Sequence, residues 1–170
     1  MIKASRAIVC TLLLLWAVLP RPISALAERG KSDADFGSIT TTARQCSLAR
    51  NGSEQACTTV QLTQRGHAGL RIRFIGSGAQ PGSSEWVTFI ARHRRGIRAL
   101  SCSHGSCDQA MQHWSADVIS ASIAHFDDRG VPMGLPDTSP MDGECQIEPK
   151  KIQCVSRSSN GLFLRAVARL

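Results

Sequence analysis

Apolar and polar residues alternate with a period of two through much of the chain after residue 38. Leu70-Arg71-Ile72-Arg73-Phe74-Ile75 alternates apolar side chains with arginines, and every second residue from Leu162 to Leu170 is apolar. This alternation is typical of a strand with one buried and one solvated face. Runs rich in Thr, Val or aromatic residues at 39–49, 55–64, 86–91 and 118–126 are bounded by turn residues. The pattern predicts eight to ten strands.

Three segments depart from this pattern. Residues 76–84 and 131–143 are rich in Gly, Pro and Ser, which predicts loops. Residues 108–116 contain Met111 and Trp114 three positions apart, so a short helix and an irregular loop both remain open. Strands do not alternate with helical segments, so a parallel sheet is not expected. The predicted fold is all-β, an antiparallel sandwich or small barrel built from hairpins.

The segment from Cys145 to Cys154 can pair with itself as a hairpin. Folded about Pro149-Lys150, it places Cys145 opposite Cys154 and Glu148 opposite Lys151, so that each rung has a matched partner. Pro149 pre-sets the backbone angle that the first central position of a type I turn requires. Directly opposed residues lie within the range that a disulfide spans. We therefore predict a disulfide at the outer rung of this hairpin.

The remaining cysteines of the mature chain follow the same rule. Cys46 and Cys57 are equidistant from Asn51-Gly52, and Cys102 and Cys107 are equidistant from His104-Gly105. Asn-Gly is the strongest signal for a two-residue hairpin turn. Six cysteines allow fifteen connectivities, but the shared symmetry favours three local disulfides, Cys46–Cys57, Cys102–Cys107 and Cys145–Cys154. Free buried thiols or a zinc site are the alternatives.

The first 27 residues have the features of a signal peptide. Lys3 and Arg6 precede an apolar run from Ala7 to Leu19, and Ala25-Leu26-Ala27 forms an A-x-A cleavage site. The run of 13 residues is short for a bilayer span, so we expect cleavage and no membrane span in the mature chain. Cys10 lies inside the signal, which leaves six cysteines for the mature protein. Paired cysteines and an export signal indicate the periplasm or secretion.

The mature chain has the length of one domain. Residues 28–37 are polar and lack periodicity, which predicts a disordered leader. Residues 38–170 then form a single β-domain. A chain of this size buries enough surface for an ordinary core, so the disulfides are expected to reinforce the fold. The sequence does not indicate an oligomeric state.

Positive charge is concentrated in the middle of the chain. Removal of Lys3, Arg6 and Arg21 from 20 basic residues leaves 17 against 13 acidic residues, yet the segment from Arg65 to Arg98 contains seven arginines and one acid. Arginine forms bidentate contacts with carboxylate, phosphate or sulfate. The alternative is a solvated face that serves solubility alone. If the two strands pair, the predicted binding face comprises Arg71, Arg73, Arg92, Arg94, Arg95 and Arg98.

Composition narrows the class of partner for this face. The protein has no tyrosine, and the mature chain has only Trp86 and Trp114 as tryptophans. Recognition of single-stranded nucleic acid uses exposed aromatic side chains among basic residues, so nucleic acid is not expected. An anionic polysaccharide, a lipid head group or an acidic protein fits an exported chain better.

Sequence motifs for catalysis or metal binding are weak. A small hydrolase would need a serine near His125 and Asp127 or Asp128, but the chain has no nucleophile-elbow motif. His104 between Cys102 and Cys107 does not match a standard zinc spacing. Enzymatic activity is therefore uncertain and not favoured, and we expect neither a metal nor a cofactor. A barrel that binds a small ligand in its interior is the main alternative to a binding face.

Several short motifs carry a family resemblance. These are Phe126-Asp127-x-Arg129-Gly130, Gly143-x-Cys145 and the alternating C-terminal strand, together with the export signal and paired cysteines. In these features the chain resembles small exported proteins of marine cyanobacteria. The resemblance implies a bacterial periplasm and no particular activity. The leading hypothesis is a non-enzymatic exported β-domain that binds an anionic partner through its arginine-rich face.

Overall fold

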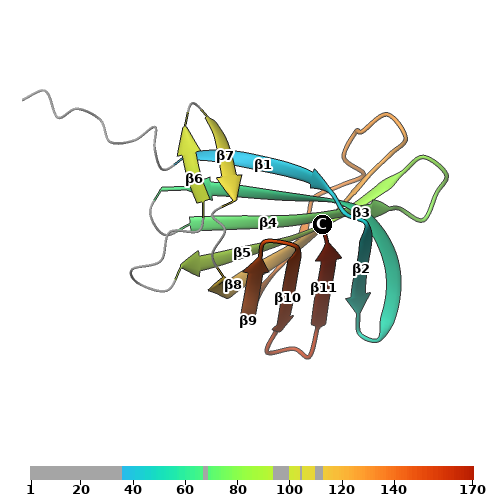
Figure 1. Ribbon diagram of the computed structural model, residues 1–170. Helices are drawn as coiled ribbons and strands as arrows, with labels where there is room; N and C mark the ends of the chain where they lie inside the picture. The colour runs from blue at the N-terminus through green and yellow to red at the C-terminus, as the bar shows by residue number, and fades with distance from the viewer. Residues whose placement is uncertain (1–35, 67–68, 94–99, 104, 110–112) are drawn as a thin grey trace, which may run out of the picture.

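The computed structural model describes residues 36–66, 69–93, 100–103, 105–109 and 113–170. These residues form eleven strands and no helix (Figure 1). The all-β class expected from the alternation is confirmed. The strands are β1 (Phe36–Thr42), β2 (Gln45–Arg50), β3 (Ser53–Arg65), β4 (Gly69–Ser77), β5 (Ser84–His93), β6 (Leu100–Ser103), β7 (Gly105–Gln109), β8 (Trp114–Phe126), β9 (Asp137–Glu148), β10 (Lys151–Arg157) and β11 (Phe163–Arg169).

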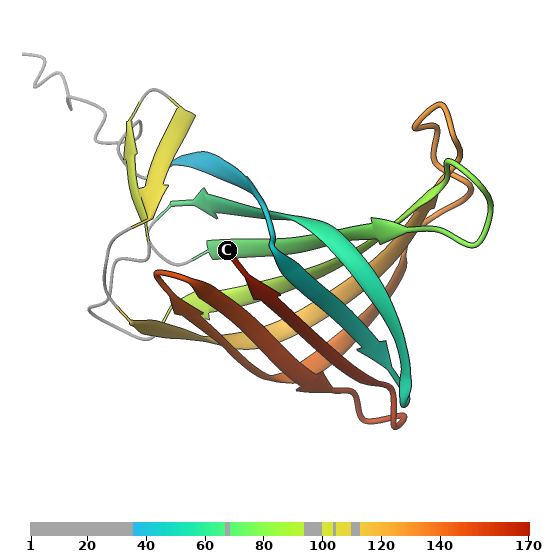
Figure 2. The ribbon, with the colours of Figure 1, turned by 45° about the vertical axis from the view of Figure 1, so that its right-hand side comes forward.

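Eight of the strands close into an antiparallel barrel (Figure 2). Neighbours around the ring follow the order β2, β11, β10, β9, β8, β5, β4 and β3, and β3 pairs with β2 to complete it. Closure removes the free edges that a sandwich would retain. Of the two architectures that the sequence left open, the structure is therefore the barrel. β1 pairs antiparallel with the second half of β3, on the edge whose first half pairs with β2. The β6–β7 hairpin is joined to β1 by a short parallel pairing.

A break between β1 and β2 makes the closure geometrically feasible. The sequence predicted one strand over 39–49, but the strand is interrupted at Ala43 and Arg44. The backbone N–H of Ala43 donates to Thr58 on β3 (2.8 Å), whereas that of Arg44 donates to Arg169 on β11 (2.7 Å). The chain thus changes partner within two residues, and β2 can join the two ends of the sheet.

The three predicted hairpins have the predicted registers. Cys154 pairs with Cys145, and Cys102 pairs with Cys107. Asn51 and Gly52 both have positive φ (49° and 88°), as a type I′ turn requires. The three predicted disulfides are confirmed: Cys46–Cys57, Cys102–Cys107 and Cys145–Cys154 have Cα–Cα distances of 4.8, 4.0 and 4.0 Å.

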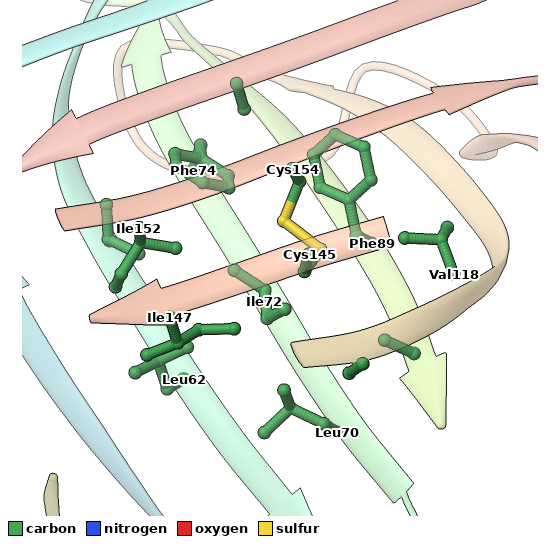
Figure 3. Close-up of a cluster of buried hydrophobic side chains, with 14 of the residues drawn as sticks. Leu62, Leu70, Ile72, Phe74, Phe89, Val118, Cys145, Ile147, Ile152 and Cys154 are labelled. Atoms are coloured by element: carbon green, nitrogen blue, oxygen red, sulfur yellow. A yellow bond between two sulfur atoms is a disulfide. The ribbon is translucent and has the colours of Figure 1, made fainter. Parts of the chain in front are cut away.

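The barrel interior is packed with apolar side chains around the Cys145–Cys154 disulfide (Figure 3). Both sulfurs are buried, because the two cysteines occupy inward-facing positions of β9 and β10. Phe74 and Phe89 approach edge to face at 5.9 Å, an arrangement that adds to the free energy of area burial. The fully buried neighbours include Val60, Leu62, Leu70, Ile72, Phe74, Phe89, Ile147 and Ile152.

The boundary predicted for the leader is wrong by two residues. Phe36 and Gly37 belong to β1, where they pair with Arg65 and Gln64, and residues 28–35 lie outside the described part. Gly37 is buried, and a Cβ at this position would lie 2.6 Å from the sulfur of Cys107. The contact explains the glycine, but it depends on β7, which is distant in sequence.

Two further segments differ from the prediction. The sequence left a short helix and a loop open for residues 108–116, but residues 108–109 end β7 and residues 114–116 begin β8, so both ends of this segment are strand. In the segment 131–143, the second half is part of β9. β9 extends beyond the end of β10, so Pro140 pairs with Ser120 of β8 and has no β10 residue opposite it. Proline is tolerated at such an edge because its missing N–H is not required there.

The interior position of Cys145–Cys154 predicts a larger contribution to stability than that of Cys102–Cys107. Replacing Cys145 and Cys154 together with Ala should lower the free energy of unfolding by about 3–4 kcal/mol, because loop closure and core packing are both lost. The Cys102–Cys107 disulfide closes a shorter loop, so replacing both of these cysteines with Ala should lower the free energy of unfolding by about 2 kcal/mol. Guanidinium unfolding measures both. A larger loss from the Cys102–Cys107 variant would contradict the assignment of Cys145–Cys154 to the core.

Candidate functional site

The outer face of β4 and β5 carries the arginines that the sequence singled out. Leu70, Ile72 and Phe74 face the interior, so Arg71 and Arg73 face outward. The two strands pair with each other, and Arg92 of β5 lies directly opposite Gly69. Gly69 is on the same face of β4 as Arg71 and Arg73, so Arg92 also faces outward. The structure therefore brings Arg71, Arg73 and Arg92 to one face. Of the six predicted binding residues, Arg94, Arg95 and Arg98 lie outside the described residues.

Arg73 is held in place by three neighbouring side chains. Its NH1 group donates to Gln61 Oε1 (3.1 Å) and its Nε group donates to Thr88 Oγ1 (3.4 Å). The guanidinium lies over the ring of Trp86, 4.4 Å from the centroid, and Trp86 packs on Phe126 with centroids 4.0 Å apart. Burial, followed by the charge of Arg71, lowers the pKa of Arg73 below its usual value.

Acidic residues border the arginine-bearing face on the side of β8 and β9. Asp117 of β8 lies opposite Arg92, and Glu144 of β9 lies opposite Asp117. Arg71 instead lies between Thr63 of β3 and Ile90 of β5, neither of which is charged. The positive charge of the face is therefore centred on Arg71 and Arg73, with Arg92 at its acidic border.

A small cavity of about 110 Å³ lies at the end of the barrel where β5 and β11 begin. Glu85 contributes to its wall, and its carboxylate accepts a hydrogen bond from the side-chain amide of Gln55. Ligand pockets usually measure about 300–1,000 Å³, so this cavity is small for a dedicated ligand site. Its apolar lining consists of Leu48, Ala49, Val87, Ile123 and Leu164.

His125 has a different partner from the one that the sequence suggested. Its Nδ1 lies 3.5 Å from Glu85 Oε2. Asp127 instead accepts hydrogen bonds from the backbone N–H of Val131 and from Arg129, and the Val131 bond is the main cause of its lowered pKa. In the described part of the chain no serine hydroxyl bonds to His125, so the Ser-His-Asp arrangement considered for a hydrolase is not assembled there.

The loop between β8 and β9 presents apolar side chains to solvent. Val131, Met133 and Leu135 are 50%, 52% and 97% exposed. The loop is ordered by Asp127 and projects beyond the barrel beside the loop between β4 and β5 (Figure 2). The two loops are in close contact, since a Cβ on Gly82 would lie 2.9 Å from Cβ of Asp128. The exposed apolar tip is a feature that the loop prediction did not anticipate.

His93 is buried at the end of β5 against Trp114, with ring centroids 5.4 Å apart. Neither ring nitrogen of His93 has a hydrogen-bond partner within the described residues. Burial lowers the pKa of His93 from 6.5, because desolvation disfavours the imidazolium form. His93 is an isolated histidine in the sequence, and the local pattern does not indicate its burial.

The lowered pKa of His93 predicts a loss of stability in mild acid. Below about pH 6.5 the unfolded chain binds the proton more readily than the folded chain, so the free energy of unfolding falls as pH decreases. Above that pH the stabilisation is fully present. Replacing His93 with Phe should flatten the dependence between pH 7.5 and 5, measured by urea unfolding. His113→Gln is the exposed control and should keep the wild-type slope; an unchanged slope in His93→Phe would contradict the prediction.

Within the described residues, His, Cys, Asp and Glu side chains form no group of three that could hold a metal ion. No helix in the described part is long and apolar enough to span a membrane. No family model, curated protein or solved structure matches the chain.

Proposed function

We propose that the protein is a non-enzymatic exported β-barrel that binds an anionic partner through the outer face of β4 and β5. The observation that carries the proposal is the position of Arg73, which stacks on Trp86 beside Arg71. A guanidinium has five N–H donors, and Gln61 and Thr88 accept from two groups, Nε and NH1. The NH2 group takes part in neither of these hydrogen bonds and is the group that we propose binds the anion.

Pre-organisation supports this role for Arg73. Stacking and two hydrogen bonds to neutral partners fix the guanidinium without neutralising its charge. A side chain that is already ordered loses less conformational entropy when it binds a ligand. Arg71, one position away on the same face, adds a second cation. The pair suits carboxylate, sulfate or phosphate groups carried by a polysaccharide, a lipid head group or an acidic protein.

Export supports the same proposal. Three disulfides are compatible with an oxidising environment outside the cytoplasm, and the N-terminal sequence has the features of a signal peptide. Arg94, Arg95 and Arg98 follow β5 directly in the sequence. Their contribution to the face stays a prediction from the sequence.

Retention on immobilised heparin tests the proposed face. The double variant Arg71→Gln/Arg92→Gln should elute at a lower salt concentration than the wild type, since charge attraction to a polyanion is screened by salt. The matched control, Arg157→Gln/Arg165→Gln, removes two exposed arginines from β10 and β11 and should elute near the wild type. Equal elution of wild type and Arg71→Gln/Arg92→Gln would contradict the proposal, provided that both are folded by circular dichroism.

Arg73 allows a second test, because it is both a structural and a proposed binding residue. Arg73→Lys keeps the charge but loses the planar fork, so it should reduce heparin retention despite an unchanged net charge. Loss of two hydrogen bonds and the stacking contact should also lower the free energy of unfolding by about 1–2 kcal/mol. Arg71→Lys is the control, because these two hydrogen bonds and the stacking contact belong to Arg73 and not to Arg71. Wild-type retention by Arg73→Lys would show that the fork is not used.

A further inference from the structure

A basic hollow lies at the end of the barrel where β2 and β10 begin and β11 ends. Its volume is about 490 Å³, and three separate segments of the chain contribute to its lining. Four of the six lining residues are cationic, and none is acidic. We call this feature the basic hollow. Its residues are Arg44, Gln45, Lys150, Lys151, Arg169 and Leu170.

Strand register brings like charges together in the basic hollow. Lys151 of β10 lies directly opposite Arg169 of β11. Like charges that are directly opposed across two strands destabilise a sheet, so this pair acts against folding. Arg169 in turn lies opposite Gln45, and its NH1 donates to Gln45 Oε1 at 3.2 Å. A neutral side chain thus orients the guanidinium and leaves its charge uncompensated.

Backbone hydrogen bonds hold the three segments in fixed relative positions. The N–H of Arg44 donates to the carbonyl of Arg169 (2.7 Å), and the N–H of Leu170 donates to the carbonyl of Lys150 (3.0 Å). The β9–β10 turn, the end of β11 and the start of β2 therefore meet at one place. The cations are brought together by the closure of the barrel, and a ligand would not have to assemble them.

One acid, Glu148, lies in register with a cation of the basic hollow. Glu148 of β9 lies opposite Lys151, but Glu148 does not line the hollow, and its Oε1 is 3.9 Å from Nδ1 of His113. No ion pair within the described residues involves Arg44, Lys150, Lys151 or Arg169. The side chains that line the hollow therefore leave its four cations without a counter-charge.

We propose that the basic hollow is a binding site for a compact oxyanion, a phosphate or sulfate group. Arginine offers two parallel donors to such a group, and lysine adds a mobile point charge with three donors. The site shares no residue with the arginine-bearing face of β4 and β5, so it goes beyond the function proposed above. A result that contradicts one of the two proposals therefore does not contradict the other.

Titration with inorganic phosphate and sulfate tests the site. Backbone amide signals of residues 44–45, 150–151 and 169–170 should shift in a saturable manner in two-dimensional NMR spectra. Chloride at equal ionic strength should cause no saturable shift. The variant Lys150→Gln/Lys151→Gln should bind at least about tenfold more weakly, since a hydrogen bond to a charged group contributes about 1.5–3 kcal/mol. Phosphate shifts no larger than chloride shifts would overturn the proposal.

One control separates the basic hollow from general surface charge. Arg165→Gln removes a cation from the same strand as Arg169 but outside the hollow, and it should bind phosphate like the wild type. An equal loss in Arg165→Gln and Lys150→Gln/Lys151→Gln would overturn the proposal.

Vesicles distinguish the source of the oxyanion. Phosphatidylcholine vesicles with and without phosphatidic acid are sedimented with the wild type and with Lys150→Gln/Lys151→Gln. Co-sedimentation that requires both phosphatidic acid and the lysines supports the site and assigns it to a lipid head group. Saturable phosphate binding without co-sedimentation supports the site with a free oxyanion. Co-sedimentation that the lysine variant retains, without saturable phosphate binding, would overturn the proposal.

Discussion

The change of partner at Ala43 and Arg44 is the constraint on which the barrel depends. One N–H binds β3 and the next binds the end of β11, so β2 pairs with both ends of the sheet that the other seven barrel strands form. Without this step β11 and the end of β3 would be exposed edges, which invite association with other chains. Closure also determines which side chains are inside. The alternating apolar residues of all eight strands then face a common interior.

The packed interior directs the search for function to the outside of the barrel. Phe74 of β4 and Phe89 of the adjacent strand β5 pack edge to face in the interior, and the Cys145–Cys154 disulfide occupies the space beside them. An interior of this kind resembles the filled core of a small barrel more than a ligand-binding cavity. The cavity near Glu85 is confined to the end of the barrel. Outward-facing arginines and the basic hollow are therefore better supported as sites than the interior.

Sequence reasoning succeeded where the determining interactions are local. The hairpin from Cys145 to Cys154 follows from cross-strand pairing about a single turn, and its register is as predicted. Alternation on β4 likewise placed Arg71 and Arg73 outside. It failed where a distant segment decides: Gly37 is buried by Cys107, and Pro140 is accommodated because β10 has already ended. Local periodicity contains no information on either contact.

The same distinction explains which parts of the candidate sites could be predicted. Arg71, Arg73 and Arg92 come from two consecutive strands, so strand pairing alone unites them. The pair of Glu85 with His125 and the basic hollow required knowledge of β8 and β11 as neighbours of β5 and β2. Local pattern does not supply such long-range pairings, because their register is set by closure of the whole ring.

The two cationic surfaces are separated by the order of strands around the barrel. The arginine-bearing face belongs to β4 and β5, and the basic hollow belongs to β10, β11 and β2. On one side two strands, β8 and β9, lie between them. On the other side only β3 intervenes. The path across β3 is therefore the shorter one for a polyanion that contacted both surfaces.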